Sequence, residues 1–226
     1  MNTFVSLQAN EQTLTERVTA TLRDAIIAGT LAPGSKLSEP KLAEQYQTSR
    51  GPIREAIRRL EIMQLVQHVP YEGVRVINLS REHMIELYHL REALEGKAAA
   101  LATKHIHPKA LESLKELLAV HKTHQKNTGK YMQANSDYDF HYQVIVASGN
   151  QFLIQQLTEK IYHLVRMYRK QFSLMSSRSE VALREHEHIF FAIEAGDAEL
   201  SEILMRRHVT RARREIENSL NSGEEK

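Results

Sequence analysis

The fold of the N-terminal region is decided by residues 49–60, which read SRGPIREAIRRL. At about 100° per residue, the apolar side chains of this stretch fall on one helix face and three arginines fall on the neighbouring face. The apolar face comprises Ile53, Ala56, Ile57 and Leu60, and the other face comprises Arg50, Arg54 and Arg58. The pattern predicts a helix that packs on a small core while it presents guanidinium groups to solvent.

The start of this helix carries suitable residues, since Ser49 is a favoured N-cap and Pro52 is tolerated in a first turn. The DNA major groove admits a helix of this kind, and guanidinium groups bind guanine edges and phosphates. A solvated basic helix face would carry the same residues. The flanking segments must therefore distinguish the two interpretations.

Upstream of residue 49, the sequence predicts two helices. Thr13 and Glu16 have capping-box spacing at the start of an amphipathic segment, and Gly29 is a natural C-terminal stop for the same segment. After a Pro-Gly turn, Ser38 is placed to cap a second short helix, and Gln47-Thr48 connects it tightly to the arginine helix. Two short helices joined in this way indicate a helix-turn-helix.

Downstream, two runs rich in β-branched residues flank a turn at residues 70–73, which indicates a hairpin over 65–77. A helix-turn-helix followed by a hairpin is a winged helix, and we place this DNA-binding domain at residues 11–78. From residue 80 to 220 the pattern is helical throughout, with breaks at Pro108, Gly129, Gly149, Ser176 and Gly196, so that one helix is expected over 150–175. We therefore expect a mostly α protein with a C-terminal all-α bundle of about six helices.

Composition limits the possible functions. The chain has 226 residues, a net charge of +2 and no cysteine, which excludes disulfide scaffolds, thiolate catalysis and cysteine-bound zinc. Any nucleic-acid surface must be local, and residues 49–60 supply one with four arginines against one glutamate. With no signal peptide and no apolar run long enough for a membrane span, we expect a cytoplasmic protein that does not associate with membranes.

Helical phase singles out a few of the twelve histidines. Asp137 and His141 are one turn apart on the inner face of a predicted helix, and His186 and His208 lie on the apolar faces of two others. His188 is expected to look outward. A carboxylate and three imidazoles buried together are costly unless paired, and a divalent transition metal would remove that cost. Hydrogen-bonded core histidines are the alternative.

The first 78 residues resemble the winged-helix domain of GntR-type bacterial transcription regulators, and the remainder resembles the helical ligand-binding domain of their FadR-like branch. The first resemblance lies in residues 26–34 (IIAGTLAPG), 42–44 (LAE) and 49–56 (SRGPIREA). The second lies in residues 90–95 (LREALE), 137–141 (DYDFH), 147–150 (ASGN) and 192–197 (AIEAGD). The resemblance implies a homodimer that binds a palindromic double-stranded operator and responds to a small organic acid.

The resemblance also implies residue roles. The four metal ligands would be Asp137, His141, His186 and His208, with zinc as the first choice of metal and nickel, manganese or iron as alternatives. Arg91 would clamp the carboxylate of the effector, although an intrahelical ion pair with Glu95 is the structural alternative.

For DNA binding, the resemblance assigns base and phosphate contacts to Arg50 and Arg54 and the wing tip to Gly73, and Ser49 and Arg58 complete the expected surface. Two positions depart from the pattern. Pro40 stands where many relatives have a DNA-contacting arginine, and Glu72 precedes the wing glycine, where a basic or neutral residue is more usual.

We therefore expect a ligand-responsive transcriptional regulator, acting as a repressor, and not an enzyme. The alternative is a metal-dependent hydrolase or lyase with an accessory winged helix. Against this alternative, no general base is evident beside the site, because helical phase directs Glu185 and Glu187 away from His186.

Overall fold

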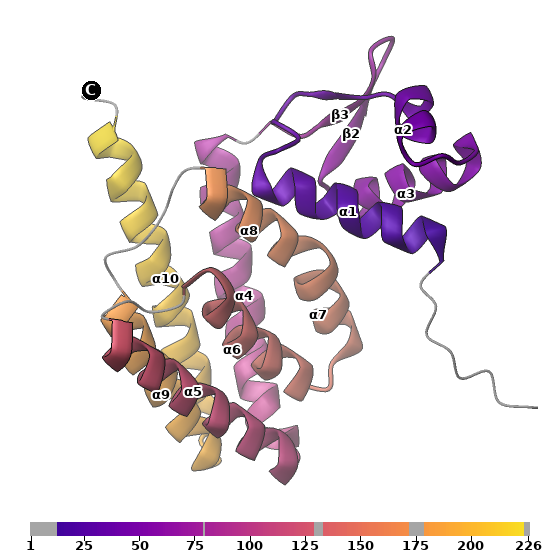
Figure 1. Cartoon of the computed structure of the whole chain (residues 1–226). Helices are drawn as coiled ribbons and strands as arrows, with labels where there is room; N and C mark the ends of the chain where they lie inside the picture. Colours follow the sequence, from indigo (N-terminus) through magenta and orange to yellow (C-terminus); the bar gives the residue numbers. More distant parts are fainter. Residues whose placement is uncertain (1–12, 79, 129–132, 172–178, 224–226) are drawn as a thin grey trace, which may run out of the picture. The chain divides into compact units, whose positions relative to one another are not determined.

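The computed structural model describes residues 13–78, 80–128, 133–171 and 179–223 (Figure 1). Contacts between residues divide the chain into two compact units that meet at Ile77 and Asn78. The first unit is a winged helix-turn-helix and the second is a bundle of helices. The expected fold class, mostly α with a small β wing, is confirmed.

Helix α1 (Leu14–Ala28) begins and ends as the sequence predicts. Thr13 and Glu16 form the reciprocal capping box, in which the Thr13 hydroxyl accepts from the Glu16 amide and the Glu16 carboxylate accepts from the Thr13 amide. Gly29 ends the helix with a positive φ of 80°, a conformation that costs glycine little. The buried face of α1 packs on α3.

Helices α2 (Glu39–Gln45) and α3 (Arg50–Ile62) form the helix-turn-helix. The connection turns through Gln47, which has a φ of 49°. Ser38 and Ser49 occupy the N-cap positions with extended backbones, but neither side chain makes a capping hydrogen bond. The expected side-chain caps are therefore absent at these two helices, whereas Ser80 does cap helix α4 (Arg81–His105) by accepting from the His83 amide.

The wing is a sheet of three antiparallel strands in the order β1-β3-β2. Strands β2 (Val66–Val69) and β3 (Gly73–Val76) form the expected hairpin. Strand β1 (Lys36–Leu37) was not predicted, because two residues are too short to show an alternating pattern. It pairs with β3 through Lys36–Arg75 and Leu37–Val74, and so joins the hairpin to the chain that enters α2.

The second unit is helical throughout the residues that the structure describes. Its long helices α4 and α10 lie side by side, and α9 packs on both α4 and α10, while α6 packs on α4 and α5 (Figure 1). The elements are α4 (Arg81–His105), α5 (Pro108–Thr128), α6 (Gln133–Ala147), α7 (Gln151–Gln156), η1 (Leu157–Ile161), α8 (Tyr162–Gln171), α9 (Ser179–Glu194) and α10 (Ala198–Gly223).

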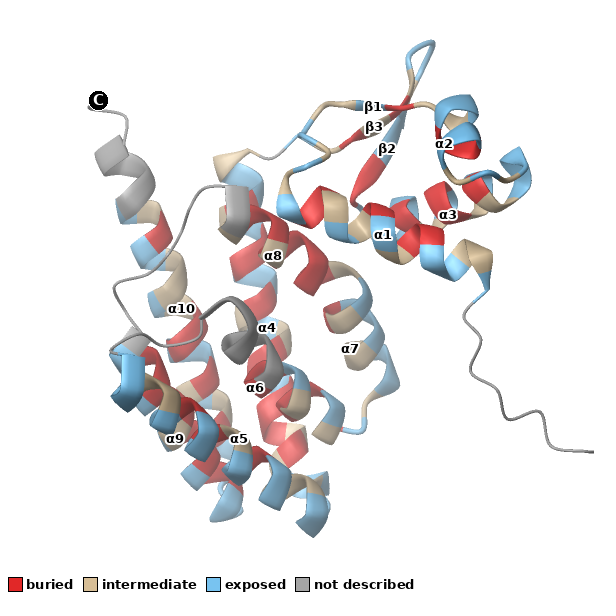
Figure 2. Ribbon diagram, viewed as in Figure 1, coloured by how far each residue is buried: buried red, intermediate tan, exposed pale blue. Residues whose placement is uncertain are grey.

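The single helix expected over 150–175 is instead three consecutive segments. The middle segment, η1, has one turn of π-helix between α7 and α8, and its buried side chains are Leu157 and Ile161. Spacing of apolar residues does not distinguish a π-turn from a regular helix. The buried faces of these helices form the core of the bundle (Figure 2).

Candidate DNA-binding helix and histidine cluster

Helix α3 separates its two faces as its sequence predicts. The residues of the apolar face are all buried, whereas Ser49, Arg50, Arg54 and Arg58 are exposed. Burial of the apolar face anchors α3 on the core, so that the arginine face is left to solvent. The geometry suits insertion of α3 into a major groove.

Arg54 has a partner that the sequence did not indicate. Its Nε donates to the Glu39 carboxylate of α2 at 2.7 Å, and Arg58 lies 3.6 Å from the Glu55 carboxylate. Residues 39 and 54 are in different helices, so periodicity within one helix cannot detect the pair. The contact restricts where the Arg54 guanidinium can point.

At the wing, Gly73 adopts a φ of 89°, which a side chain would strain. Glu72, whose negative charge was unexpected there, is paired with Arg75 at 2.7 Å. Arg75 also donates to the Gly34 carbonyl oxygen at 2.7 Å. The carboxylate of Glu72 therefore meets a positive partner within the wing itself.

The second unit brings together His141 of α6, His186 of α9 and His208 of α10. One ring nitrogen from each lies within 4.8 Å of the others. The His208 Nε2 is 3.2 Å from the Nε2 of both His141 and His186. All three side chains are 0–3 % exposed, so the cluster is enclosed by the bundle. His188 is exposed, as expected.

The sequence indicated Glu95 only as an ion-pair partner of Arg91 and gave no sign that it contacts His141. Its carboxylate is 2.5 Å from the His141 Nδ1 and accepts from the Arg91 Nε at 2.6 Å. Burial alone would raise the pKa of Glu95, but the guanidinium of Arg91, together with the contact to the His141 ring, outweighs that effect and lowers it to about 2. The carboxylate is therefore ionised in the folded protein.

For Arg91, the sequence allowed two roles, an intrahelical ion pair with Glu95 or a clamp for the effector. The structure shows the ion pair. Burial opposes the charge of the guanidinium, but the Glu95 carboxylate raises the pKa of Arg91 above its ordinary value. The guanidinium lies 4.7 Å from the centre of the Tyr88 ring. Its Nη1 is buried and has no hydrogen-bond partner among the residues described.

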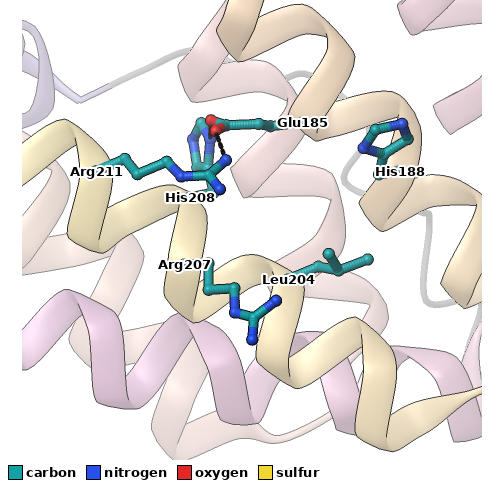
Figure 3. A pocket seen from close by; sticks show the side chains of 6 residues that line it. All are labelled: Glu185, His188, Leu204, Arg207, His208 and Arg211. Carbon is teal, nitrogen blue, oxygen red and sulfur yellow. Dashed lines mark hydrogen bonds and ion pairs between the residues drawn. The ribbon is translucent and has the colours of Figure 1, made fainter.

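A second carboxylate lies beside His208. Glu185 contacts the His208 Nδ1 at 2.8 Å and the Arg211 guanidinium at 2.5 Å (Figure 3). The expectation that no carboxylate base lies beside the site was wrong, because Glu185 reaches His208 on α10. Glu185, His208 and Arg211 line a cavity of about 220 Å³. The other lining residues are His188, Leu204 and Arg207 (Figure 3).

The donor chemistry of the cluster fits a divalent transition metal. Neutral imidazole is a common ligand for zinc, nickel and iron, and three such nitrogens from three helices face one another in the buried interior. Asp137, the expected fourth ligand, lies on α6, but its side chain is outside the described residues. Its role stays a prediction.

Comparison with known proteins accounts for almost the whole chain. Residues 14–76 match the family model described as bacterial regulatory proteins, gntR family, and residues 86–211 match the FCD domain. Among the described residues, no helix combines the length and apolar character needed to cross a membrane.

Two repressors are among the relatives. The chain is 30% identical to the probable D-xylose utilization operon transcriptional repressor of Paenarthrobacter nicotinovorans, over 90% of this chain and 91% of that protein. It is 26% identical to the HTH-type transcriptional repressor GlaR of Escherichia coli (strain K12), over 83% and 89%. The relatives are transcriptional regulators and not enzymes, so the hydrolase or lyase alternative is set aside.

Solved structures have the same fold. The E. coli McbR/YncC structure aligns with a TM-score of 0.74 at 23% identity, covering 92% of this chain and 99% of that one. A putative GntR regulator from Rhodococcus sp. RHA1 aligns with a TM-score of 0.69 at 25% identity, covering 90% and 97%. From its winged helix to its FCD domain, the chain belongs to the GntR family of bacterial transcriptional regulators.

Proposed function

We propose that this regulator is a homodimeric repressor whose helical domain binds a divalent metal ion, zinc first, and a small organic acid. The observation that carries the proposal is the meeting of three buried imidazole nitrogens from α6, α9 and α10. The ligands would be His141, His186 and His208, with Asp137 as the fourth.

Support for the metal comes from proton counting. A neutral imidazole carries one N–H and one lone pair. The Nδ1 atoms of His141 and His208 lie beside the Glu95 and Glu185 carboxylates, which favour the N–H on Nδ1, so their two Nε2 atoms, 3.2 Å apart, would both present lone pairs and could not hydrogen-bond to each other. Protonating the rings would place positive charge at a buried site, which is costly. A shared cation lets every Nε2 act as a donor of its lone pair.

Support for an organic acid comes from coordination number and from Arg91. When bound, the metal would supply the coordination positions beyond its protein ligands that a carboxylate can occupy. The buried Arg91 Nη1 is an additional hydrogen-bond donor in the same unit. We retain Arg91 as an effector contact on this ground, although its Nε already binds Glu95.

Support for repression of a palindromic operator comes from the winged helix and from the relatives, two of which are named as repressors. A dimer presents two copies of α3, and half-sites about one helical turn of DNA apart match that symmetry. Arg50, Arg54 and Arg58 of α3, with Ser49 and the wing at Gly73, would contact the duplex. Access to the chromosome implies a cytoplasmic location.

The test uses the full chain, a fluorescent duplex obtained by selection from random sequences, and a panel of amino acids, sugar acids, hydroxy acids and keto acids. Metal content is measured before and after treatment with a chelator. We expect one acid to raise the thermal midpoint and to change duplex affinity in the zinc-loaded protein only, since a ligand stabilises the state that binds it.

Two outcomes would contradict the proposal. One is purified protein that takes up no divalent metal at micromolar concentration. The other is an acid response that is identical in the chelated and the zinc-loaded protein. In either case, the three histidines would be structural, and the site of the effector would have to lie elsewhere.

A further inference from the structure

We infer that Glu95 and Glu185 are positioning residues of the histidine cluster: each holds the proton of one imidazole on Nδ1 and thereby aims the lone pair of Nε2 at the centre. This inference rests on the proposed metal site and adds the two carboxylates that orient its histidine ligands. The two carboxylates reach the cluster from different helices, Glu95 from α4 and Glu185 from α9.

The first step concerns which nitrogen carries the proton. The His208 Nδ1 is hydrogen-bonded to the Glu185 carboxylate at 2.8 Å, and the His141 Nδ1 lies 2.5 Å from the Glu95 carboxylate in a close contact that lacks hydrogen-bond geometry. An ionised carboxylate can only accept a hydrogen bond, so it retains the imidazole proton on Nδ1. The Nε2 of each ring is then a lone pair, and the two lone pairs face each other across 3.2 Å.

The second step concerns what holds the carboxylates. The other oxygen of Glu95 accepts from Arg91 at 2.6 Å, and the other oxygen of Glu185 accepts from Arg211 at 2.5 Å. The arrangement arginine–carboxylate–imidazole therefore occurs twice. Each arginine fixes the orientation of its carboxylate, and the carboxylate in turn fixes the orientation of a ligand ring.

The two arrangements differ in their access to solvent. Arg91 and Glu95 are sealed in the interior, whereas the Arg211 side chain is 58% exposed at the rim of the 220 Å³ cavity. In Figure 3, Arg211 and His208 both meet the carboxylate of Glu185. A change at Arg211 or Glu185 can therefore alter the centre without opening the core.

The experiment measures zinc affinity of the full chain by competition with a chromogenic chelator. Glu185→Gln keeps the size and an acceptor oxygen but removes the charge, and we expect zinc affinity to fall about 10–100-fold. Arg211→Gln should also lower the affinity for zinc. The matched controls are Glu187→Gln, which removes a carboxylate of α9 that binds Lys122, and Arg207→Gln, one turn from Arg211.

A second measurement separates positioning from a general effect on folding. The visible absorption of the cobalt-loaded protein reports ligand geometry, and we expect its bands to shift in Glu185→Gln and to be unchanged in Glu187→Gln. The metal-free thermal midpoint of each variant controls for folding. Glu95→Gln is the parallel variant in the interior. If Glu95→Gln does not fold, the Glu185→Gln measurements alone test the positioning role.

The outcomes are distinguishable. Wild-type zinc affinity and an unshifted cobalt spectrum in Glu185→Gln would overturn the positioning role while leaving the metal centre intact. If the wild-type protein takes up neither zinc nor cobalt, the metal centre fails, and the positioning role fails with it.

Discussion

At the scale of single residues, Arg54 is the most informative side chain of the proposed DNA-binding surface. It extends from α3 into solvent, and Glu39 of α2 binds its Nε at 2.7 Å. This contact leaves the other guanidinium nitrogens available and limits the rotamers of a long side chain, which reduces the entropy lost on binding. A glutamate beside the groove also offsets part of the positive charge of α3.

Arg54→Ala should weaken operator affinity by about 1–3 kcal/mol, because a bidentate guanine contact of the arginine has about that value. Fluorescence anisotropy with the selected duplex at fixed salt measures the loss. Arg59→Ala is the control, since Arg59 lies on the same helix but is half-buried and paired with Glu55. Equal affinities of the two variants would show that α3 does not enter the groove by its arginine face.

At the scale of elements, α3 depends on its buried face to present its exposed one. Leu60 is fully buried, whereas Ile62, two residues later, is 52% exposed. Leu60→Ala should destabilise the winged-helix unit by about 2–5 kcal/mol through lost burial and a cavity, while Ile62→Ala should change little. Hydrogen exchange of peptides from α1 and α3 measures both, and equal protection in the two variants would refute this account of the core.

The capping box of α1 carries a pH dependence. Backbone and side-chain hydrogen bonds from Thr13 lower the pKa of Glu16 below its ordinary value of 4.5. The carboxylate therefore stabilises the folded state fully above 4.5, and that stabilisation is lost as the pH falls through the lowered folded value. Gln at this position keeps the hydrogen bond but cannot ionise.

Urea denaturation of the wild type and Glu16→Gln should show a more stable wild type at about pH 7, with the difference shrinking at pH values below about 4. The sign follows because the folded state lowers the pKa of Glu16, so protonation of its carboxylate in acid destabilises the folded state. A difference that is independent of pH, or that grows in acid, would mean that the charge of Glu16 has no part in the cap.

Element types and helix faces were predictable from the sequence because they depend on local spacing. The buried stripe of α3 and the inward phases of His141, His186 and His208 follow from a period of about 3.6 residues. The cap of α1 follows from the spacing of Thr13 and Glu16. Strand β1 and the π-turn η1 were not predictable, since one is too short and the other changes the period.

Contacts between elements were also beyond the sequence. Glu39 reaches Arg54, Glu95 reaches His141, and Glu185 reaches His208 only because different helices pack together. Helical phase gives the direction of a side chain relative to its own helix and no information on the neighbour. The contacts of Glu95 and Glu185 with the histidine cluster could therefore be found only in the structure.

At the scale of the whole molecule, regulation requires that an event in the helical unit alter DNA binding by the winged helix. A ligand can shift such an equilibrium only by its differential affinity for two states of the protein. The metal-loaded cluster is the proposed place of that differential binding, because it joins α6, α9 and α10 and, through Glu95, α4.

The most direct test of this account is calorimetric titration of zinc into the metal-free forms of His186→Ala and His188→Ala. The two histidines lie two residues apart on α9, one fully buried in the cluster and the other exposed. The account predicts that His188→Ala binds one zinc per chain with the affinity of the wild type, and that His186→Ala loses this binding. Equal zinc affinity of the two variants would contradict it.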